Sequence, residues 1–283
     1  MASLTGAGRA GKMPASEARG VLREVVEAMG GEGVLEGFRL NGRRALVTGA
    51  GRGIGRTTAC ALAAAGAEVT LCARSGDELE RACREIARNG FAARPLVADV
   101  TDVGGFGNAI AALPAFDVFV NNAGTNRPKP LAEVTEDDYD AVMGLNVKAA
   151  VFAAQAVTRA MLASRVRGSV INMSSQMGHV GAANRTIYCA SKWALEGFTK
   201  ALAVELGPAG IRVNALAPTF IETPMTRPFL QNEEHRRQIV SKIKLGRLGQ
   251  LGDLVGAVIF LASDASALMT GSSLVIDGGW TAE

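Results

Sequence analysis

The sequence predicts an α/β fold: a doubly wound parallel sheet of about seven strands with helices on both faces. The first observation is a regular alternation of short apolar segments with longer segments of helical periodicity. The second is a glycine-rich turn between the first apolar segment and the first helical one. The length of 283 residues fits a single domain of this kind with a short extension.

The N-terminal residues 1–37 are predicted to form that extension. Its start, residues 1–14, is rich in Gly, Ala and Ser and is expected to be disordered. Residues 15–29 have the spacing of an amphipathic helix that Ser16 can cap. The single main domain is then expected to span residues 38–283.

Seven short apolar runs are the expected strands of this domain: 44–48, 68–72, 95–98, 116–120, 169–173, 211–216 and 273–276. Helical periodicity fills the intervals, most clearly at 53–65, 77–88, 138–164 and 186–206. In such folds, ligands bind at the carboxyl ends of the strands near the switch in strand order. Functional residues are therefore expected directly after strands.

The turn after the first strand reads Thr48-Gly49-Ala50-Gly51-Arg52-Gly53-Ile54-Gly55. Gly49, Gly53 and Gly55 permit a tight turn and a close approach of backbone to a pyrophosphate, and the next helix begins with free N–H groups. No Gly-Lys-Ser/Thr follows, which excludes a Walker P-loop. The turn predicts dinucleotide binding.

The end of the second strand bears on the choice between NAD and NADP. An NAD site usually has a carboxylate here for the ribose hydroxyls, but this chain has Arg74, and no acid appears before Asp77. A guanidinium matches a 2′-phosphate, so Arg74 and Arg52 favour NADP, with NAD as the alternative.

Few side chains can carry a proton near neutral pH, because the chain has only two tyrosines and two histidines. Tyr188 and Lys192 are four residues apart in an expected helix and so share a face. A neighbouring ammonium lowers the pKa of a phenol, and a decrease of ~3 units corresponds to about 4 kcal/mol. Tyr188 would then act as a general base near working pH.

Ser175 stands at the carboxyl end of the fifth expected strand, where its hydroxyl can donate to a substrate oxygen. Each of these features is common by chance. A glycine loop followed along the chain by Ser175, Tyr188 and Lys192 is a much more specific pattern. Further matching segments are Asp99-Val100, Asn121-Asn122-Ala123-Gly124, Asn146 and Asp277-Gly278-Gly279. With them the sequence resembles the short-chain dehydrogenase/reductase family over about residues 40–281.

The resemblance implies a Rossmann fold that binds NAD or NADP and transfers hydride to or from a secondary alcohol or ketone. It implies that Tyr188 is the general acid/base, that Ser175 orients the substrate carbonyl, and that Lys192 lowers the tyrosine pKa and binds the nicotinamide ribose. Asn146 would hold a water that relays protons to Lys192. The implied cofactor-binding residues are Gly49, Arg52, Gly53, Ile54, Gly55, Arg74, Asp99, Val100, Asn121, Ala123, Gly124, Tyr188, Lys192, Pro218, Ile221 and Thr223.

The segment after the sixth strand resembles the loop that holds the nicotinamide amide, although the family usually has Pro-Gly where this chain has Pro218-Thr219. Residues 219–249 combine prolines with a charged stretch and are predicted to be an insertion that acts as a lid.

Composition excludes several other classes of protein. With 30 Lys and Arg against 27 Asp and Glu, the net charge of +3 is too balanced to indicate a nucleic-acid partner. Cys60, Cys72, Cys83 and Cys189 form no C-x-x-C pair, so neither a metal site nor a disulfide framework is expected. No signal peptide or membrane-spanning run is apparent, and we expect a cytoplasmic protein.

Two substrate classes compete within the family. The chain looks similar to sugar and sugar-acid dehydrogenases such as gluconate or glucose dehydrogenases, and also to 3-oxoacyl-carrier-protein reductases. A different class of hypothesis is a non-catalytic nucleotide sensor on the same fold. A sugar acid is favoured as the substrate, because the guanidinium of Arg127, after the fourth strand, can bind a carboxylate through two N–H groups. The polar side chains of Gln176, His179 and Asn184 are suited to binding the hydroxyl groups of such a substrate. Arg185, three residues before Tyr188, is a second cation that could reach the pocket mouth, and for both arginines a place in a subunit interface is the alternative.

The two long helices at 138–164 and 186–206 are apolar on more than one face. A helix with two apolar stripes requires two partners, and a neighbouring subunit is the usual second partner in this family. We therefore expect a homotetramer, with a homodimer as the alternative.

Overall fold

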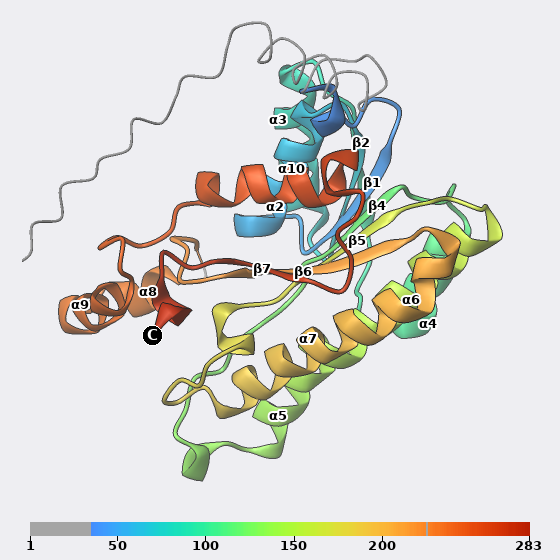
Figure 1. The fold of residues 1–283 in the computed structure, drawn as a ribbon. Coiled ribbons are helices and arrows are strands. Elements are labelled where there is room, and N and C mark those ends of the chain that lie inside the picture. Colours follow the sequence, from blue (N-terminus) through green and yellow to red (C-terminus); the bar gives the residue numbers. More distant parts are fainter. Residues whose placement is uncertain (1–34, 225) are drawn as a thin grey trace, which may run out of the picture.

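A computed structural model describes residues 35–224 and 226–283, so the predicted helix at 15–29 and most of the extension lie outside the described residues. The described chain contains a seven-stranded sheet in the order β3-β2-β1-β4-β5-β6-β7 (Figure 1). Its strands are β1 (Arg44–Thr48), β2 (Glu68–Ala73), β3 (Ala93–Val97), β4 (Val118–Asn121), β5 (Ser169–Met173), β6 (Arg212–Pro218) and β7 (Ser273–Ile276). All neighbouring strands are parallel, which confirms the predicted fold class.

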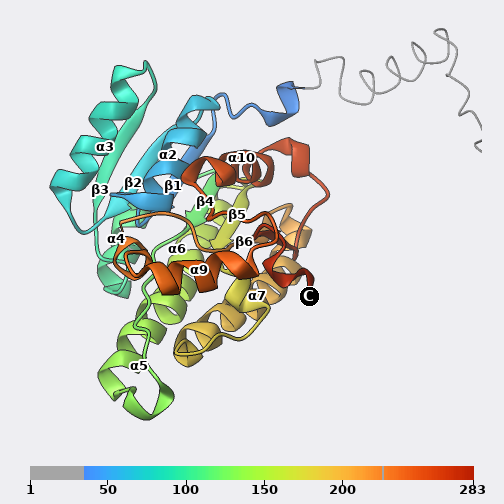
Figure 2. The same ribbon diagram turned by 90° about the vertical axis from the view of Figure 1, so that its left-hand side faces the viewer.

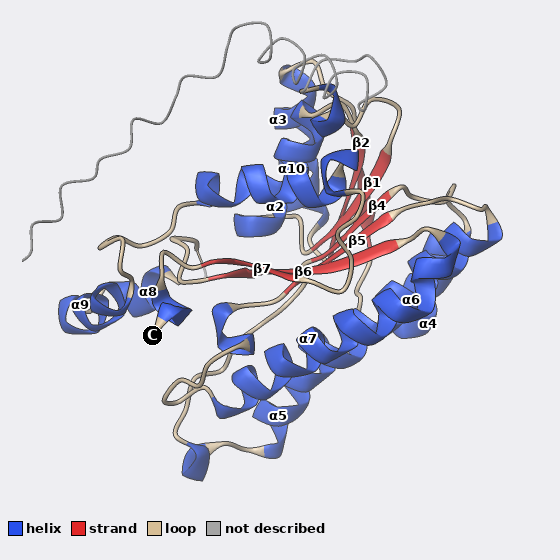
Figure 3. Cartoon of the chain, viewed as in Figure 1, coloured by secondary structure: helices blue, strands red, loops and turns tan. Residues whose placement is uncertain are grey.

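The helices are α2 (Gly53–Ala64), α3 (Gly76–Arg88), α4 (Val103–Ala111), α5 (Glu136–Met143), α6 (Ala150–Ala163), α7 (Thr186–Leu206), α8 (Arg227–Leu230), α9 (Glu233–Lys242) and α10 (Val255–Ala262). Helices α2, α3 and α10 cover one face of the sheet, and α4, α6 and α7 cover the other (Figures 1 and 3). The quarter-turn view of Figure 2 places α3 beside the edge strand β3.

Both faces of the sheet are buried, which is why the central strands are continuous apolar runs rather than alternating ones. On the α2 side, Val47, Val69 and Leu71 pack against Leu62 and residues of α3 and α10. On the other side, Leu46, Phe119 and Val170 pack against α4, α6 and α7. The strand order reverses between β1 and β4, and such a switch opens a crevice at the carboxyl edge of the sheet.

The segment predicted as one helix at 138–164 differs from that prediction in two ways. It begins at Glu136, because Thr135 and Asp138 form a capping box. It is also interrupted by a π-helical turn at Gly144–Ala149, between α5 and α6. Periodicity does not reveal a π turn, because the apolar stripe continues through it.

The run from α5 to α6 is, among the described residues, long and apolar enough to span a membrane by length and composition. Its side chains Ala153, Ala154, Val157 and Met161 are buried in the second core, and a core helix passes the same test.

The segment predicted as a lid, 219–249, folds as α8 and α9 beyond the carboxyl end of β6 (Figure 1). It has its own small core of Leu230, Ile239, Ile243 and Leu248, against which Trp280 packs. Trp280 in turn stacks on Phe220 with ring centroids 5.6 Å apart. The segment packs against the C-terminal region through Trp280, and at its start Thr223 lies next to the glycine loop, where a Cβ on Gly53 would be 3.7 Å from Thr223 Cβ.

Candidate active site

A cavity of about 620 Å³ follows the carboxyl ends of the strands, at the switch in strand order. Of the residues predicted from sequence, it brings together Gly49, Arg52, Gly53, Ile54, Arg74, Asp99, Val100, Ala123, Gly124, Ser175, Gln176, Tyr188, Lys192, Pro218, Ile221 and Thr223. One end is formed by the glycine loop, β2 and β3, and the other by the residues after β5 and the start of α7. The lining does not include Gly55, Asn121, Arg127, Asn146, His179 or Asn184.

The glycine loop has the geometry that a pyrophosphate requires. Gly49 and Gly53 adopt φ values of +65° and +55°, which favour glycine. The N-cap of α2, Arg52, makes no side-chain capping bond, so the first N–H groups of that helix are available to an anion at the cavity wall. The residues present therefore fit a dinucleotide.

Gly55 has a packing role, and its predicted contact with the cofactor stays a prediction. A Cβ atom on Gly55 would lie 2.3 Å from the carbonyl oxygen of Gly49 and 2.5 Å from Nδ2 of Asn122. Asn122 holds the loop from β4, because its Nδ2 donates to the carbonyl oxygen of Thr48 at 2.9 Å. Its backbone N–H donates to Thr48 Oγ1 at 3.0 Å. In the sequence, Asn122 is one residue of the Asn121-Asn122-Ala123-Gly124 motif, in which the cofactor contact is predicted for Asn121.

That neighbour, Asn121, is buried and lies outside the cavity lining, and its predicted contact with the cofactor stays a prediction. Its Nδ2 donates to the carbonyl oxygen of Ala150 at 2.8 Å and to Oδ1 of Asn172 at 3.1 Å. Successive residues of a strand end point to opposite faces, so only one of the two asparagines can reach the cavity.

The adenosine end of the cavity has two arginines that already face acids. Arg52 lies 3.6 Å from Glu78, and Arg74 lies 3.9 Å from Asp99. Both guanidinium groups are largely exposed, so these are weak pairs that an incoming phosphate can replace. Asp99 is held in place by Thr101, whose N–H and Oγ1 donate to its Oδ1 at 2.9 and 2.7 Å.

The catalytic end combines Ser175, Tyr188 and Lys192 on one wall. Ser175 Oγ donates to Oε1 of Gln176 at 2.8 Å and accepts from the N–H of Met177 at 3.1 Å. The Ser175 hydroxyl lies near enough to Tyr188 to lower the pKa of its phenol. Lys192 lies with Nζ 5.6 Å from the centre of the Tyr188 ring.

The pKa values of Tyr188 and Lys192 are both shifted by burial. Burial raises the pKa of Tyr188, and the nearby Ser175 hydroxyl and the charge of Arg185 offset only part of that increase. Burial also lowers the pKa of Lys192 to about 8, against the opposing effect of Glu196. In the cofactor-free protein, desolvation therefore outweighs the neighbouring charges at Tyr188, and the lowering of its pKa by Lys192 stays a prediction.

Asn146 lies behind the cavity wall, in the π-helical turn. Its Oδ1 accepts from the N–H of Thr125 at 2.8 Å, and its Nδ2 donates to the carbonyl oxygen of Thr125 and to Ser191 Oγ. A Cβ on Gly124 would lie 3.3 Å from Oδ1 of Asn146 and 3.8 Å from Nζ of Lys192. Asn146 thus joins the Gly124 turn to α7 near Lys192, and its predicted relay role remains a prediction.

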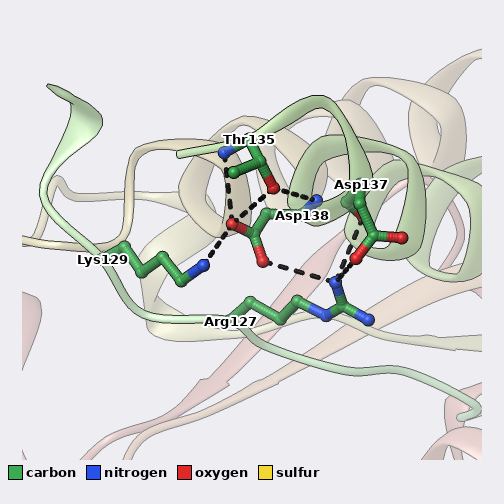
Figure 4. A network of polar contacts seen from close by, with 5 residues as sticks. All are labelled: Arg127, Lys129, Thr135, Asp137 and Asp138. Atoms are coloured by element: carbon green, nitrogen blue, oxygen red, sulfur yellow. Dashed lines mark hydrogen bonds and ion pairs between the residues drawn. The ribbon is translucent and has the colours of Figure 1, made fainter. Parts of the chain in front are cut away.

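Arg127 does not reach the cavity, so its predicted contact with a substrate carboxylate is wrong. Its Nη1 lies 2.5 Å from Asp137 and 3.3 Å from Asp138 (Figure 4). Lys129 Nζ binds the other oxygen of Asp138 at 2.5 Å, and Thr135 donates to the same carboxylate. These five residues form a clasp that ties the loop after β4 to the start of α5. The guanidinium of Arg127 is therefore already paired with the carboxylates of Asp137 and Asp138.

His179 and Asn184 also lie outside the cavity lining, which corrects their predicted roles. His179 Nε2 lies 2.9 Å from Ser273 Oγ and 3.3 Å from Oε1 of Glu196. Asn184 is exposed, has a φ of +59°, and its carbonyl oxygen accepts from the N–H of Lys129 at 3.1 Å. In contrast, Asn126 and Arg185 do line the cavity. The position of Arg185, one helical turn before Tyr188, was the signal for it.

A Rossmann-type sheet, a dinucleotide cradle and a Ser-Tyr-Lys wall in one cavity define a nicotinamide-dependent oxidoreductase. A family model described as enoyl-(acyl carrier protein) reductase matches residues 49–281. The chain belongs to the short-chain dehydrogenase/reductase family and is an oxidoreductase that uses a nicotinamide cofactor.

Several relatives are similar over nearly their whole length. An L-xylulose reductase of Mus musculus is 39% identical over 243 residues, which is 86% of this chain and 98% of the relative. A gluconate 5-dehydrogenase of Gluconobacter oxydans is 40% identical, over 86% of this chain and 96% of the relative. The crystal structure of a gluconate 5-dehydrogenase from Burkholderia cenocepacia, in complex with NADP and tartrate, matches with a TM-score of 0.86 and 38% identity. That match covers 89% of this chain and 100% of the other.

Proposed function

We propose that this protein is an NADP-dependent oxidoreductase that interconverts a secondary alcohol and a ketone of a sugar or sugar acid. The observation that carries the proposal is the Ser175-Tyr188-Lys192 wall at one end of a cavity whose other end is a pyrophosphate cradle. The named activities of the L-xylulose reductase and gluconate 5-dehydrogenase relatives support the same substrate class.

In this proposal, residues of the protein transfer the proton. When bound, the nicotinamide ring accepts or gives the hydride. Ser175 donates its hydroxyl hydrogen to the substrate oxygen, and Tyr188 gives a proton to that oxygen in reduction or removes it in oxidation. Lys192, held by its 2.8 Å bond to the Met173 carbonyl, supplies a positive charge beside the phenol.

NADP is proposed over NAD because Arg52 and Arg74 border the adenosine end and are exposed enough to turn toward a 2′-phosphate. Two neighbouring structures, the Burkholderia enzyme and a 2-deoxy-D-gluconate 3-dehydrogenase candidate from Agrobacterium tumefaciens, hold NADP. We expect Arg74→Ala to weaken NADPH binding by about tenfold or more and to leave NADH binding nearly unchanged. Tighter binding of NADH than of NADPH by the wild type would contradict this choice.

The polar character of the catalytic end favours a polyhydroxylated substrate over an acyl thioester. Among the described residues, buried side-chain atoms without a hydrogen-bond partner include Asn126 Oδ1, Gln176 Nε2, Ser174 Oγ and Thr219 Oγ1, and all four residues line the cavity. Buried polar atoms of this kind need partners from the ligand, which hydroxyl groups supply and a hydrocarbon chain does not.

The decisive experiment is a reduction assay with NADPH, following the nicotinamide absorbance. Its panel contains L-xylulose, a ketogluconate and a short 3-oxoacyl thioester. Turnover of at least one of the first two, at a higher kcat/KM than for the thioester, is expected. Preference for the thioester would favour a 3-oxoacyl reductase, and cofactor binding without any turnover would favour a nucleotide sensor.

We also propose that the protein forms a homotetramer through α7. One stripe of that helix is exposed and apolar or small: Ala190, Trp193, Gly197, Ala201 and Val204. Trp193 is 54% and Val204 80% exposed, which is a large apolar surface for a monomer. Sedimentation velocity at micromolar concentration should show a tetramer for the wild type and smaller species for Trp193→Glu. The control Leu268→Glu alters a fully exposed leucine outside α7 and should leave the assembly intact.

A further inference from the structure

We infer that Gln176 is a positioning residue for Ser175: its side-chain amide turns over when a substrate carbonyl binds, and the turn releases the Ser175 hydroxyl hydrogen to the substrate. The inference rests on the proposed function and deepens it. It assigns control of the hydrogen that Ser175 donates to a side chain outside the set of Ser175, Tyr188 and Lys192.

The hydroxyl hydrogen of Ser175 is already in use in the structure. Ser175 Oγ donates to Oε1 of Gln176 at 2.8 Å and accepts from the backbone N–H of Met177 at 3.1 Å. A hydroxyl group has one hydrogen and two lone pairs, so it cannot make a good hydrogen bond to the amide oxygen and to a substrate oxygen at once. Ser175 can therefore bind a substrate oxygen as a donor only after its bond to Gln176 is broken.

Gln176 also has a donor that is not in use. Its side chain is 1% exposed, and Gln176 and Ser175 both line the cavity. Its Nε2 atom is buried and has no hydrogen-bond partner among the described residues. A buried N–H group without a partner is costly. In the orientation observed, the amide thus leaves its donor unpaired while its acceptor holds the one hydrogen that the reaction needs.

A half-turn of the amide about its last side-chain bond changes both conditions. This torsion is broad and roughly two-fold, and the two ends of an amide are nearly alike in shape, so the turn requires no movement of the backbone. Nε2 then donates to Ser175 Oγ, which keeps its bond from Met177 and has its hydrogen free for the substrate carbonyl. Oε1 takes the former place of Nε2, where it can accept from a substrate hydroxyl group.

The substrate selects the turned amide, because only that orientation leaves the Ser175 hydrogen available to a carbonyl oxygen. Both lone pairs of Ser175 Oγ and its hydrogen are then in hydrogen bonds. The bond from Gln176 polarises the hydroxyl group and strengthens the bond that Ser175 donates to the substrate.

The backbone around Gln176 is fixed, so that the side-chain amide is the part that can change. Gln176 begins the short helical turn Gln176–Gly178 directly after Ser175. Its backbone carbonyl oxygen accepts from the N–H groups of His179 and Val180 at 3.0 and 3.2 Å. These bonds hold the turn at the carboxyl end of β5.

The test uses two substitutions that change different parts of the chemistry of the amide. In Gln176→Glu the ionised carboxylate can only accept, so it retains the Ser175 hydrogen. In Gln176→Met a side chain of similar length neither donates nor holds that hydrogen. The control Gln155→Glu makes the first change at an exposed position of α6.

The variants are assayed with NADPH and with L-xylulose or the ketogluconate, whichever has the higher kcat/KM in the wild type. At pH 9, Gln176→Glu should lower kcat/KM by about 100-fold or more, the usual effect of losing a donor to a developing oxyanion. Gln176→Met should lower it by less than about tenfold, because the Ser175 hydrogen stays free. Gln155→Glu should behave as the wild type.

The pH profile separates this role from a packing role of Gln176. A protonated carboxyl group can donate, so kcat/KM of Gln176→Glu relative to the wild type should rise by up to about tenfold for each unit that the pH falls between 9 and 6. Tyr188 and Lys192 titrate in both proteins, and Arg185 stays charged, so the ratio reports the introduced carboxyl group. Wild-type kcat/KM of Gln176→Glu at pH 9, or a ratio that does not change with pH, would overturn the inference.

Titration of Tyr188 tests the same inference without turnover, by phenolate absorbance in a Tyr139→Phe background. The Ser175 hydroxyl lowers the pKa of Tyr188, and it does so by offering its hydrogen to the phenolate. If the amide turns, the wild type offers that hydrogen with the support of Nε2, and Gln176→Met should raise the midpoint. If Oε1 keeps the hydrogen, Gln176→Met frees it, and an unchanged or lower midpoint contradicts the turn.

The two measurements separate this inference from the proposed function. If the wild type reduces no ketone of the panel but Gln176→Met raises the midpoint of Tyr188, the proposed reaction is wrong and the role of Gln176 stands. If the wild type reduces the sugar ketones but the ratio for Gln176→Glu does not depend on pH, the reaction stands and the role of Gln176 is wrong.

Discussion

Lys192 Nζ lies 5.6 Å from the centre of the Tyr188 ring, one helical turn away on α7, and at the same time donates to the carbonyl oxygen of Met173 at 2.8 Å. The bond to β5 holds the ammonium against the sheet edge, and the helix sets its distance from the phenol. Lys192 is buried and Tyr188 partly buried, and desolvation disfavours the charged form of each: it lowers the pKa of Lys192 and raises the pKa of Tyr188.

Tyr188→Phe removes the proton carrier and keeps the ring. We expect kcat to fall by about 10²- to 10⁴-fold, which is the usual contribution of general acid/base catalysis. The NADP dissociation constant should change by less than about tenfold, since at most one neutral hydrogen bond is lost. Steady-state rates and fluorescence titration measure the two quantities. A variant that keeps more than about a tenth of the rate would exclude this role for Tyr188.

The ionisation of Tyr188 can be observed directly, because the chain has only two tyrosines. In Tyr139→Phe the phenolate absorbance reports Tyr188 alone. Its midpoint in the cofactor-free protein should lie above the ordinary value of 10.0, because burial disfavours the phenolate. Circular dichroism over the same range verifies that the protein stays folded. A midpoint below that value would mean that Lys192 outweighs burial.

Lys192→Met should make the cofactor-free protein more stable while abolishing turnover. Burial lowers the pKa of Lys192 from 10.5 to about 8, which corresponds to about 3 kcal/mol of destabilisation at pH 7, where both states are protonated. Leaving the Met173 carbonyl without a donor costs about 1–3 kcal/mol, so a net gain of about 1 kcal/mol is expected.

The sign of this effect depends on pH. Between pH 8 and 10.5 the unfolded chain binds more protons at Lys192 than the folded one, so the wild type becomes more stable as pH rises. The advantage of Lys192→Met should therefore shrink across that window. Urea unfolding of both proteins at several pH values measures the difference. A constant or growing advantage would show that the lysine is not desolvated in the folded state.

Gly55→Ala should weaken cofactor binding and stability together. The added Cβ would lie 2.3 Å from the Gly49 carbonyl oxygen, so the glycine loop or α2 must shift. Such overpacking typically costs about 1–3 kcal/mol of unfolding free energy. Gly144→Ala is the control, because a Cβ there meets nothing within 4 Å. Wild-type NADP affinity in Gly55→Ala would contradict the packing role of this glycine.

The sequence was sufficient to predict the features that depend on local periodicity and on chain order. The strand at 169–173 and the start of the helix at 186–206 agree with the structure to the residue, because apolar patterning and β-branched residues report burial directly. Four of the proposed site residues, Ser175, Tyr188, Lys192 and Gln176, were placed by their position after strands or by helical spacing. The π turn at Gly144–Ala149 was not predicted, because it leaves the apolar pattern unchanged.

Only the tertiary structure decided which polar side chains face the cavity. Arg127 and Arg185 are equally plausible cations in the sequence, but the acids of α5 bind the first, and the second is buried beside Tyr188. Likewise Asn121 and Asn122 differ by one residue, and the pleat of β4 sends only Asn122 to the cavity. Local patterns specify which element a residue belongs to. Its partners come from elements far away in the chain, and these partners determine whether a side chain lines the cavity or is bound elsewhere in the protein.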